Sequence, residues 1–301
     1  MQPRSSKKVI TRRDFLKTGG YAAAGGLLGL PLLERAAGQA AVKSRVVLIR
    51  DPDVVDSRGR VNETVLESML DQAVTTLLGA QNPRSAWQQL FRPGDVVGIK
   101  SNVWYRLPTP EALEKALVFR LQQAGVNSND IAVDDRGIRD NPVFKRSTAL
   151  INVRPMRTHH WSGLGTLLKN YIMFAPAPWM YHGNGCERLG AIWQKYQVAG
   201  KTRLNILVML TPLFHGIGPH HYSSRYVWPY AGLIVSTDPV AADATGARII
   251  EAKRDAFFGG SRPISPPPGH IAAADTRFGL GCSSPERIEL IRVGWEDQIL
   301  I

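Results

Sequence analysis

Residues 150–174, LINVRPMRTHHWSGLGTLLKNYIMF, contain the pattern on which the prediction of the fold rests. The apolar, β-branched run at 149–153 is bounded by Pro155 and predicts a buried strand. The spacing of the apolar residues at 167–173 predicts a helix. Between these two elements, at 154–166, we expect a loop that carries cations, hydroxyl groups and glycines to the start of the helix.

This central loop is the first candidate for a functional site. Free backbone N–H groups and the helix dipole favour an anion at a helix N-terminus, and Gly163 and Gly165 would allow close backbone approach. An ordinary solvated turn between strand and helix is the alternative. His159 is the candidate for proton transfer, because the ordinary pKa of histidine lies near neutrality. The candidate ligand-binding residues of this stretch are Arg154, Arg157, Thr158, Lys169 and Asn170.

Strand-like and helix-like segments alternate along the rest of the chain. This alternation predicts an α/β layered fold with a largely parallel central sheet and flanking helices. The predicted strands lie at 45–49, 95–99, 131–133, 149–153, 204–210, 231–235 and 287–293. The predicted helices lie at 62–78, 109–125, 167–173 and 187–198, with a further one after Asp238, and the expected N-caps are Asn62, Thr109 and Asp238.

Polar residues follow several of the predicted strands. Ligands in α/β folds tend to bind outside the carboxyl ends of the strands, so we expect a shared cleft there, although loops are also polar without any function. Asp134 is the tentative catalytic partner of His159 in this cleft. The further candidate ligand-binding residues are Lys100, Asn102 and Asp238.

The first 40 residues have the pattern of an export signal. Residues 11–17, TRRDFLK, match the twin-arginine motif, and the apolar, glycine-rich run at 21–33 is too short to span a membrane comfortably. Small residues precede Ala41, with no cysteine for a lipid anchor. The sequence therefore predicts a twin-arginine signal peptide at 1–40 and a single α/β domain at 41–301. The twin-arginine export machinery is the expected partner, and the mature protein is expected to be periplasmic or otherwise exported, with no stable membrane anchor.

The charge of the chain narrows the class of ligand. The full sequence has 37 Lys and Arg residues against 25 Asp and Glu residues; without residues 1–40 the balance is 30 against 23, a net charge of +7. There is no lysine-rich tract, zinc-finger spacing or RNA-binding signature. We therefore predict a small anionic ligand and no nucleic acid.

The number of cysteines and the spacing of histidines limit the cofactors that the sequence predicts. The two cysteines, Cys186 and Cys282, are too few to ligate an iron–sulfur cluster, which typically needs four thiolates, so an internally ligated cluster is not expected. Whether they pair in a disulfide depends on a separation that the sequence does not give. No HExxH or other recognised metal-binding spacing is present, and we assign no metal site. The cofactor is otherwise unknown.

Several motifs, taken in order, resemble the domain of unknown function 362 family over about residues 45–295. These motifs are VGIKSN at 97–102, Thr158-His159, Lys169-Asn170, GIGP at 216–219, STDPVAAD at 236–243 and FGLG at 278–281. Members of this family are α/β proteins, often exported by the twin-arginine route, and some carry ferredoxin-like iron–sulfur segments, which this chain lacks. The chain departs from the family pattern at Arg157, where lysine is usual, and at Met209, where an aspartate commonly follows the strand. The resemblance implies a fold, a compartment and the place of a site, but no reaction.

Two classes of function remain open on the sequence alone. The first is an enzyme, in one version redox-linked, that acts on a small anionic substrate. In it Arg154, Arg157 and Lys169 would orient a carboxylate or phosphate. The second is a non-catalytic periplasmic binding or accessory protein. An acid–base pair within the cleft favours the enzyme, whereas cations without a carboxylate in reach favour the binding protein.

Overall fold

A computed structural model describes residues 43–216 and 221–301. The predicted signal peptide, including Arg12 and Arg13, lies outside the described residues. In the part of the chain that is described, no helix is both long and apolar enough to cross a membrane.

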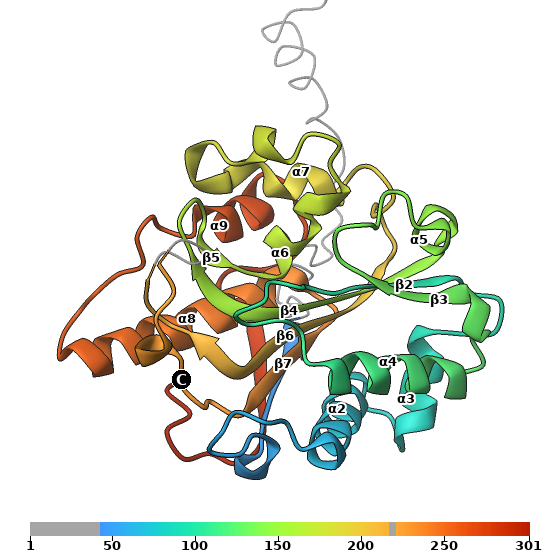
Figure 1. Ribbon diagram of the computed structural model, residues 1–301, viewed down its shortest axis with the longest axis horizontal. Helices are drawn as coiled ribbons and strands as arrows, with labels where there is room; N and C mark the ends of the chain where they lie inside the picture. Colours follow the sequence, from blue (N-terminus) through green and yellow to red (C-terminus); the bar gives the residue numbers. More distant parts are fainter. Residues whose placement is uncertain (1–42, 217–220) are drawn as a thin grey trace, which may run out of the picture. The chain divides into compact units, whose positions relative to one another are not determined.

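A mixed, largely parallel sheet with helices on both faces forms the centre of the described structure (Figure 1). This confirms the predicted fold class. The strand order is β3-β2-β4-β6-β7-β1-β8, and β5 is added antiparallel to β4. The strands are β1 (Ser44–Arg50), β2 (Val97–Lys100), β3 (Ile131–Asp134), β4 (Ala149–His159), β5 (Gly163–Gly165), β6 (Thr202–Leu213), β7 (Gly232–Ser236) and β8 (Ile288–Gly294).

The seven predicted strands are all present in the sheet. Strands β4 and β6 lie in its middle, and they are buried along almost their whole length because helices cover both faces there. The side chains of β1 alternate between the two halves of the core: Val46 and Leu48 pack on one face, and Val47 and Ile49 on the other. The sheet thus divides the core into two apolar layers.

Strand β7 is the exception to the parallel arrangement. It runs antiparallel to both of its neighbours, β6 and β1. A parallel pair needs a long crossover, usually a helix, but between β6 and β7 the described residues contain only the short 3-10 turn η7 (Ser224–Tyr226). Asp238, which follows β7, therefore lies at the sheet edge opposite to the carboxyl ends of β2 and β4. The prediction that Asp238 joins the strand-end cleft is wrong.

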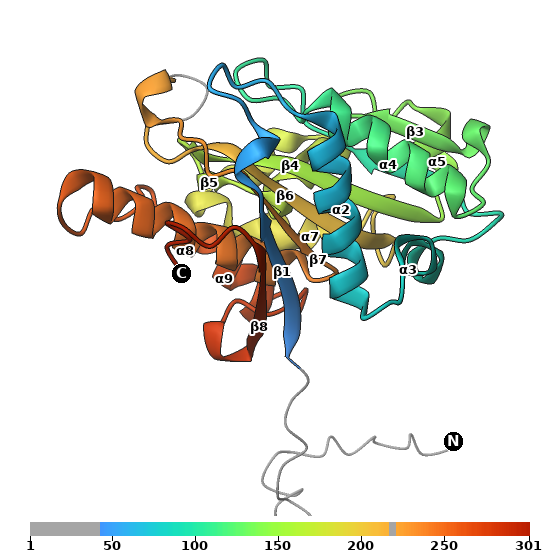
Figure 2. The ribbon, with the colours of Figure 1, turned by 90° about the horizontal axis from the view of Figure 1, so that it is seen from below.

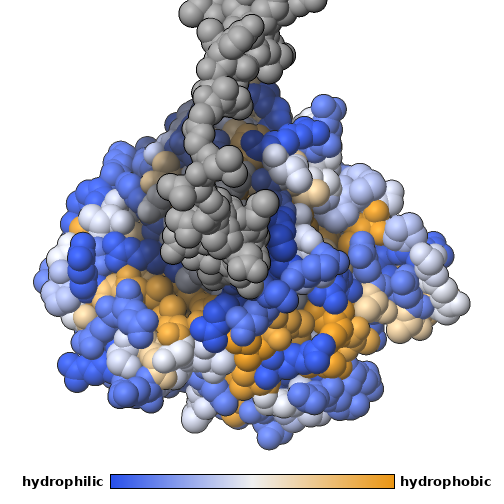
Figure 3. Space-filling view, turned by 180° about the vertical axis from the view of Figure 1, so that it is seen from behind, coloured by the Kyte–Doolittle hydropathy of each residue, from blue (hydrophilic) through white to orange (hydrophobic). Residues whose placement is uncertain are grey.

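Helices cover the sheet from two sides (Figures 1 and 2). Helices α2, α3 and α4 lie on one face, and α6, α7, α8 and α9 lie on the other. The space-filling view in Figure 3 shows one side of the molecule, where hydrophilic side chains surround patches of apolar ones. The helices are α2 (Glu63–Leu78), α3 (Pro83–Leu90), α4 (Glu111–Gln123), α5 (Pro142–Arg146), α6 (Leu167–Asn170), α7 (Gly190–Trp193), α8 (Pro239–Phe258) and α9 (Gly269–Thr276).

The predicted N-caps were correct in two cases of three. Asn62 caps α2 by accepting a hydrogen bond from Val65 N, and Asp238 caps α8. Thr109 does not cap α4; its Oγ1 accepts a hydrogen bond from Asn102 N at 3.1 Å instead. Thr109 thus closes the loop that follows β2, and this loop reaches the site described below.

Two predicted helices are shorter than expected. The helix expected at 167–173 is the single turn α6, continued by the 3-10 turn η3 (Tyr171–Phe174). The helix expected at 187–198 consists of the 3-10 turn η5 (Asn184–Leu189) and the one-turn α7. Positive φ angles at Gly185 and Cys186 interrupt the helical backbone there.

Candidate functional site

A pocket of about 230 Å³ lies where β2 and β4 end, beside α6. It brings together residues from segments that lie far apart in the sequence. Six of the sequence-predicted site residues line it: Asn102, Arg154, Arg157, His159, Lys169 and Asn170. The other lining residues are Trp104, Asp135, Arg136, Ile172, Met173, Pro178 and His182.

Strand β4 supplies the central cations of this pocket. The structure corrects the expected loop, because Arg154, Arg157 and His159 lie within β4, which then turns back as the short β5. Arg157 pairs with Gly165 in this hairpin. A Cβ atom on Gly165 would lie 2.9 Å from Arg154 Nη2, so glycine at this position leaves room for the guanidinium beside the backbone.

The first two backbone amides of α6 donate hydrogen bonds to a side chain of the protein. The carboxylate of Asp243, on α8, accepts hydrogen bonds from Leu167 N and Leu168 N, both at 2.9 Å. Burial raises the pKa of Asp243 to about 7, although the hydrogen bonds from Thr166 and from these two amides oppose the shift. The expected anion site at this helix N-terminus is therefore already filled by a side chain of the protein.

Lys100 and Asp135 form a buried ion pair beside the pocket, and Asp135 contributes to its lining. Lys100 Nζ donates to the Asp135 carboxylate and, at 2.7 Å, to Ser101 O. Burial lowers the pKa of Lys100 to about 8, against the raising effect of Asp135. Burial alone would raise the pKa of Asp135, but the charge and hydrogen bond of Lys100 hold it below its usual value. Both groups are thus engaged with each other.

Asn170 links β2 and β4 through hydrogen bonds. Its Nδ2 donates to Asn152 Oδ1 at 2.8 Å and to Val153 O at 3.0 Å, both on β4. Its Oδ1 accepts from Lys100 Nζ at 3.3 Å. Asn102 is the second amide of the site, and its Oδ1 accepts from Arg157 Nη1 at 2.9 Å. These buried amides fix the positions of the cations around the pocket.

Arg154 and Arg157 are buried without acidic partners. Each side chain is only 4% exposed, and neither Nε has a hydrogen-bond partner among the described residues. In the same part of the chain, no side chain or carbonyl accepts a hydrogen bond from Arg154. Burial lowers the pKa of Arg154 to about 10 and that of Arg157 well below its ordinary value. Arg157 also stacks on Trp104, with its Cζ atom 4.5 Å from the ring centroid.

His159 lies among these cations and its imidazole ring is neutral. Burial first, and then the charges of Lys169 and Arg154, lower its pKa far below the ordinary value. Trp161 N donates to His159 Nδ1 at 3.3 Å, so the ring proton resides on Nε2. His159 can therefore donate a hydrogen bond from Nε2, but it is a poor source of a full proton.

Besides Asp238 and Lys100, two predicted site residues lie outside the lining of this pocket. Asp134 accepts hydrogen bonds from Gly137 N at 3.0 Å and Asn141 Nδ2 at 3.1 Å, which makes it a turn residue outside the pocket lining. Thr158 lines a separate pocket, with His215 and Arg254, and is absent from the lining of the pocket beside α6. Thr158 therefore does not share the pocket with Arg157 as expected, and the carboxylate of that pocket belongs to Asp135.

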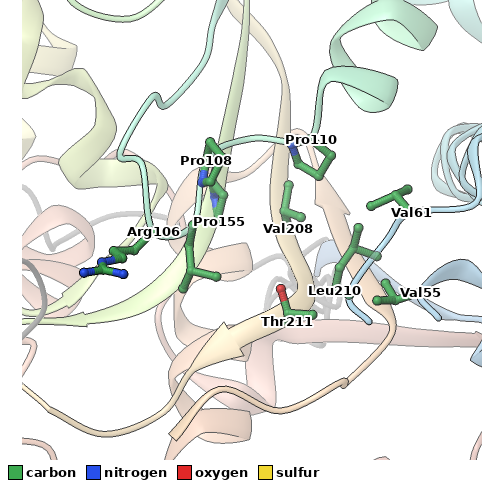
Figure 4. A pocket seen from close by; sticks show the side chains of 11 residues that line it. Val55, Val61, Arg106, Pro108, Pro110, Pro155, Val208, Leu210 and Thr211 are labelled. Carbon is green, nitrogen blue, oxygen red and sulfur yellow. The ribbon is translucent and has the colours of Figure 1, made fainter. Parts of the chain in front are cut away.

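A second pocket, of about 260 Å³, opens at the same end of the sheet but on its other face (Figure 4). Pro155 and Val208 contribute to its wall, and its lining is mostly apolar. Arg106 is the one charged residue among its described lining residues, and Figure 4 shows its guanidinium pointing away from Val208. The buried cations therefore distinguish the pocket beside α6 as the candidate site.

The two cysteines are both free and buried, so the disulfide that the sequence left open is not formed. Cys186 lies beside the site, where Lys169 Nζ donates to its Sγ at 3.6 Å. Burial raises the pKa of the Cys186 thiol. Cys186 therefore stays protonated at neutral pH and does not neutralise Lys169.

Residues 133–248 match the model of one protein family, Domain of unknown function (DUF362). The match supports the resemblance found in the sequence, although it spans less than the expected 45–295. It includes Asp135, the cations of β4 and α6, and Asp243, whereas Asn102 and Trp104 lie outside it. No curated protein and no solved structure matches the chain.

The sequence did not single out three residues that shape the site. The prediction named Asp134 and not its neighbour Asp135, because nothing in the sequence pattern distinguishes two adjacent carboxylates. Trp104 lies in the loop after β2, where only its apolar character would have suggested burial. Asp243 could have been found, since it lies in a run of small and apolar residues, 239–247, that predicts a buried part of the helix.

Proposed function

We propose that this chain is an exported protein that binds a small anionic ligand in the pocket beside α6. The observation that carries the proposal is the excess of buried cations. Three buried basic residues, Arg154, Arg157 and Lys169, line the pocket, and Asp135, the one carboxylate among its described lining residues, is already paired with Lys100. A buried cation without a partner is costly, so an anion that enters the pocket gains strong, charge-assisted hydrogen bonds.

The composition of the lining favours a short ligand with one anionic end. Arg154 and Arg157 present guanidinium groups, which suit a carboxylate or phosphate in a two-point contact. Ile172, Met173 and Pro178 provide an apolar wall for the rest of the ligand. A cavity of about 230 Å³ suits a metabolite-sized molecule rather than a polymer.

Binding is the function that the side chains support best. Asp135 is held by Lys100, and His159 is kept neutral, so the pair does not form a ready acid and base. The second candidate is an enzyme, in one version redox-linked. It is favoured by a separate observation: among the described residues, the amine of Lys169 forms no ion pair with a carboxylate. If His159→Ala spares binding but removes turnover of a bound ligand, the enzyme is favoured.

Binding is tested by calorimetry with phosphate, acetate and pyruvate against the mature chain. Replacing Arg157 or Lys169 with alanine should weaken binding about tenfold or more, since a charge-assisted hydrogen bond typically contributes about 1.5–3 kcal/mol. Because both side chains are buried, the melting temperature of each variant is measured in parallel, so that a loss of folding is separated from a loss of affinity. Arg139→Ala is the matched control, because Arg139 is an exposed arginine outside the pocket. Equal affinity of the variants and wild type, or no binding of any anion, would refute the proposal.

Export is the second part of the proposal, and it is supported by the twin-arginine motif at 11–17. The export machinery recognises the arginine pair, so replacing Arg12 and Arg13 with lysine should leave the precursor in the cytoplasm. Cell fractionation with an antibody to the mature chain measures the outcome. Replacing Lys7 and Lys8 with arginine preserves charge outside the motif and should leave export intact. Normal export of the Arg12/Arg13 variant would contradict the assignment.

A further inference from the structure

Lys169 is a buried lysine of the site whose charged atom has no ionised partner among the described residues. Its side chain is only 2% exposed, yet in the described ranges 43–216 and 221–301 it forms no ion pair. Its one hydrogen bond, to Cys186 Sγ, is long, and the acceptor is an uncharged thiol. The amine is therefore buried at the pocket wall without a group that would hold it as an ammonium ion.

Lys100 provides an internal comparison. It is equally buried, but its Nζ atom donates to Asp135, Ser101 O and Asn170 Oδ1, which accounts for all three of its protons. A lysine so held is a structural cation. Lys169 lacks such partners and faces the cavity, so it is the chemically available amine of the pair.

We infer that Lys169 is a nucleophile that forms a Schiff base with the carbonyl group of a small 2-oxo carboxylate. The inference rests on the proposed function, since Arg154 and Arg157 would hold the carboxylate. In a 2-oxo acid the carbonyl carbon is bonded directly to the carboxylate carbon, so amine and guanidinium groups must share one small cavity. All three residues line the same pocket.

The reaction needs no other reactant. The Lys169 nitrogen adds to the carbonyl carbon and gives a carbinolamine; the C–O bond then breaks, and the oxygen leaves with the two amine protons as water. His159 Nε2–H is positioned in the pocket lining to donate a hydrogen bond to the carbonyl oxygen. The product is an imine between the ligand and Lys169, and hydrolysis reverses it.

The environment of Lys169 increases the fraction of free amine at neutral pH. Burial, followed by the charges of Arg154 and Arg157, lowers the pKa of Lys169 to about 8, although Cys186 opposes the shift. At pH 7 about one molecule in ten then has the neutral amine, far more than for an ordinary lysine. Desolvation next to other cations is a known means of activating a lysine nucleophile.

Reductive trapping tests the inference. The mature chain is incubated with pyruvate and sodium cyanoborohydride, and the adduct is located by intact mass and peptide mapping. One carboxyethyl group should appear on Lys169, with a yield at early times that rises about fivefold from pH 7 to pH 8. Lys169→Arg should lose the adduct, whereas Lys195→Arg, at an exposed lysine, should retain it. Acetone, which lacks a carboxylate, should give little trapping.

A parallel measurement of melting temperature with pyruvate separates this inference from the proposed function. Stabilisation by pyruvate without an adduct would overturn the Schiff base and leave the anion site standing. An adduct that persists in Lys169→Arg, or that is spread over exposed lysines, would also overturn it. If no anion stabilises the protein and no adduct forms on Lys169, both proposals fail.

Discussion

Replacing Asp135 with asparagine should lower the free energy of unfolding by about 3–5 kcal/mol. The substitution keeps the shape of the side chain but leaves the Lys100 ammonium buried without its counter-charge. Lys100 has no route to water, because its side chain is fully buried. Removing one partner of such a pair is more costly than removing both, since the remaining charge keeps its desolvation penalty. Chemical denaturation at pH 7 measures the loss.

The neighbouring carboxylate is the matched control for this prediction. Asp134→Asn retains an oxygen that accepts from Gly137 N, so it should cost about 1 kcal/mol or less. A double variant, Asp135→Asn with Lys100→Met, should recover much of the stability, because no buried charge is left unpaired. Equal effects of the two single substitutions would show that the ion pair contributes little.

The effect of Asp135→Asn should also depend on pH. Loss of the carboxylate removes the group that raises the pKa of Lys100, so the pKa should fall below about 8. The folded variant then releases the Lys100 proton more readily than the unfolded chain does. Stability should therefore increase as the pH rises through the folded-state pKa toward the ordinary lysine value, and the deficit relative to wild type should shrink.

The sequence predicted the strands well because apolar, β-branched runs are the direct signature of a covered sheet. It misjudged 154–159, which continue β4, because their polar side chains interrupt the apolar pattern. Arg154 and Arg157 are buried although they are arginines, since they face a pocket inside the fold rather than solvent. A pattern of hydrophobicity alone cannot separate a strand that lines a polar pocket from a solvated loop.

The sequence predicted the cations of the site correctly, but it did not predict the carboxylates correctly. Asp134 and Asp135 are adjacent, and the side to which a strand-end residue points changes with each position. Asp238 was assigned to the cleft because β7 was expected to be parallel; the connection from β6 lacks a predicted crossover helix, which was the available warning. The DPVAAD motif, 238–243, has two carboxylates that cap helices: Asp238 caps α8, and Asp243 caps α6. Both carboxylates of the motif are thus bonded to backbone amides at helix starts.

Replacing Arg154 with methionine should have opposite effects on stability and on binding. Without ligand, the free energy of unfolding should rise by about 1–4 kcal/mol, because an apolar side chain of similar length replaces a buried charge that has no hydrogen-bond partner among the described residues. Binding of a small carboxylate should weaken by about 10- to 100-fold, through the loss of charge-assisted hydrogen bonds. This combination is expected of a binding site whose charged residues lower the stability of the ligand-free protein.

Arg50 offers the control, because it is an equally buried arginine whose bonds are satisfied. It donates to Tyr230 O at 2.8 Å and to Asp297 O, and it stacks over Tyr230 and Trp295. Arg50→Met should therefore destabilise the protein by about 1–3 kcal/mol and leave ligand affinity unchanged. If Arg154→Met behaves in the same way as Arg50→Met, Arg154 is a structural residue.

A third readout distinguishes the roles of the two arginines. The charge of Arg154 lowers the pKa of Lys169, so that pKa should rise in Arg154→Met and stay constant in Arg50→Met.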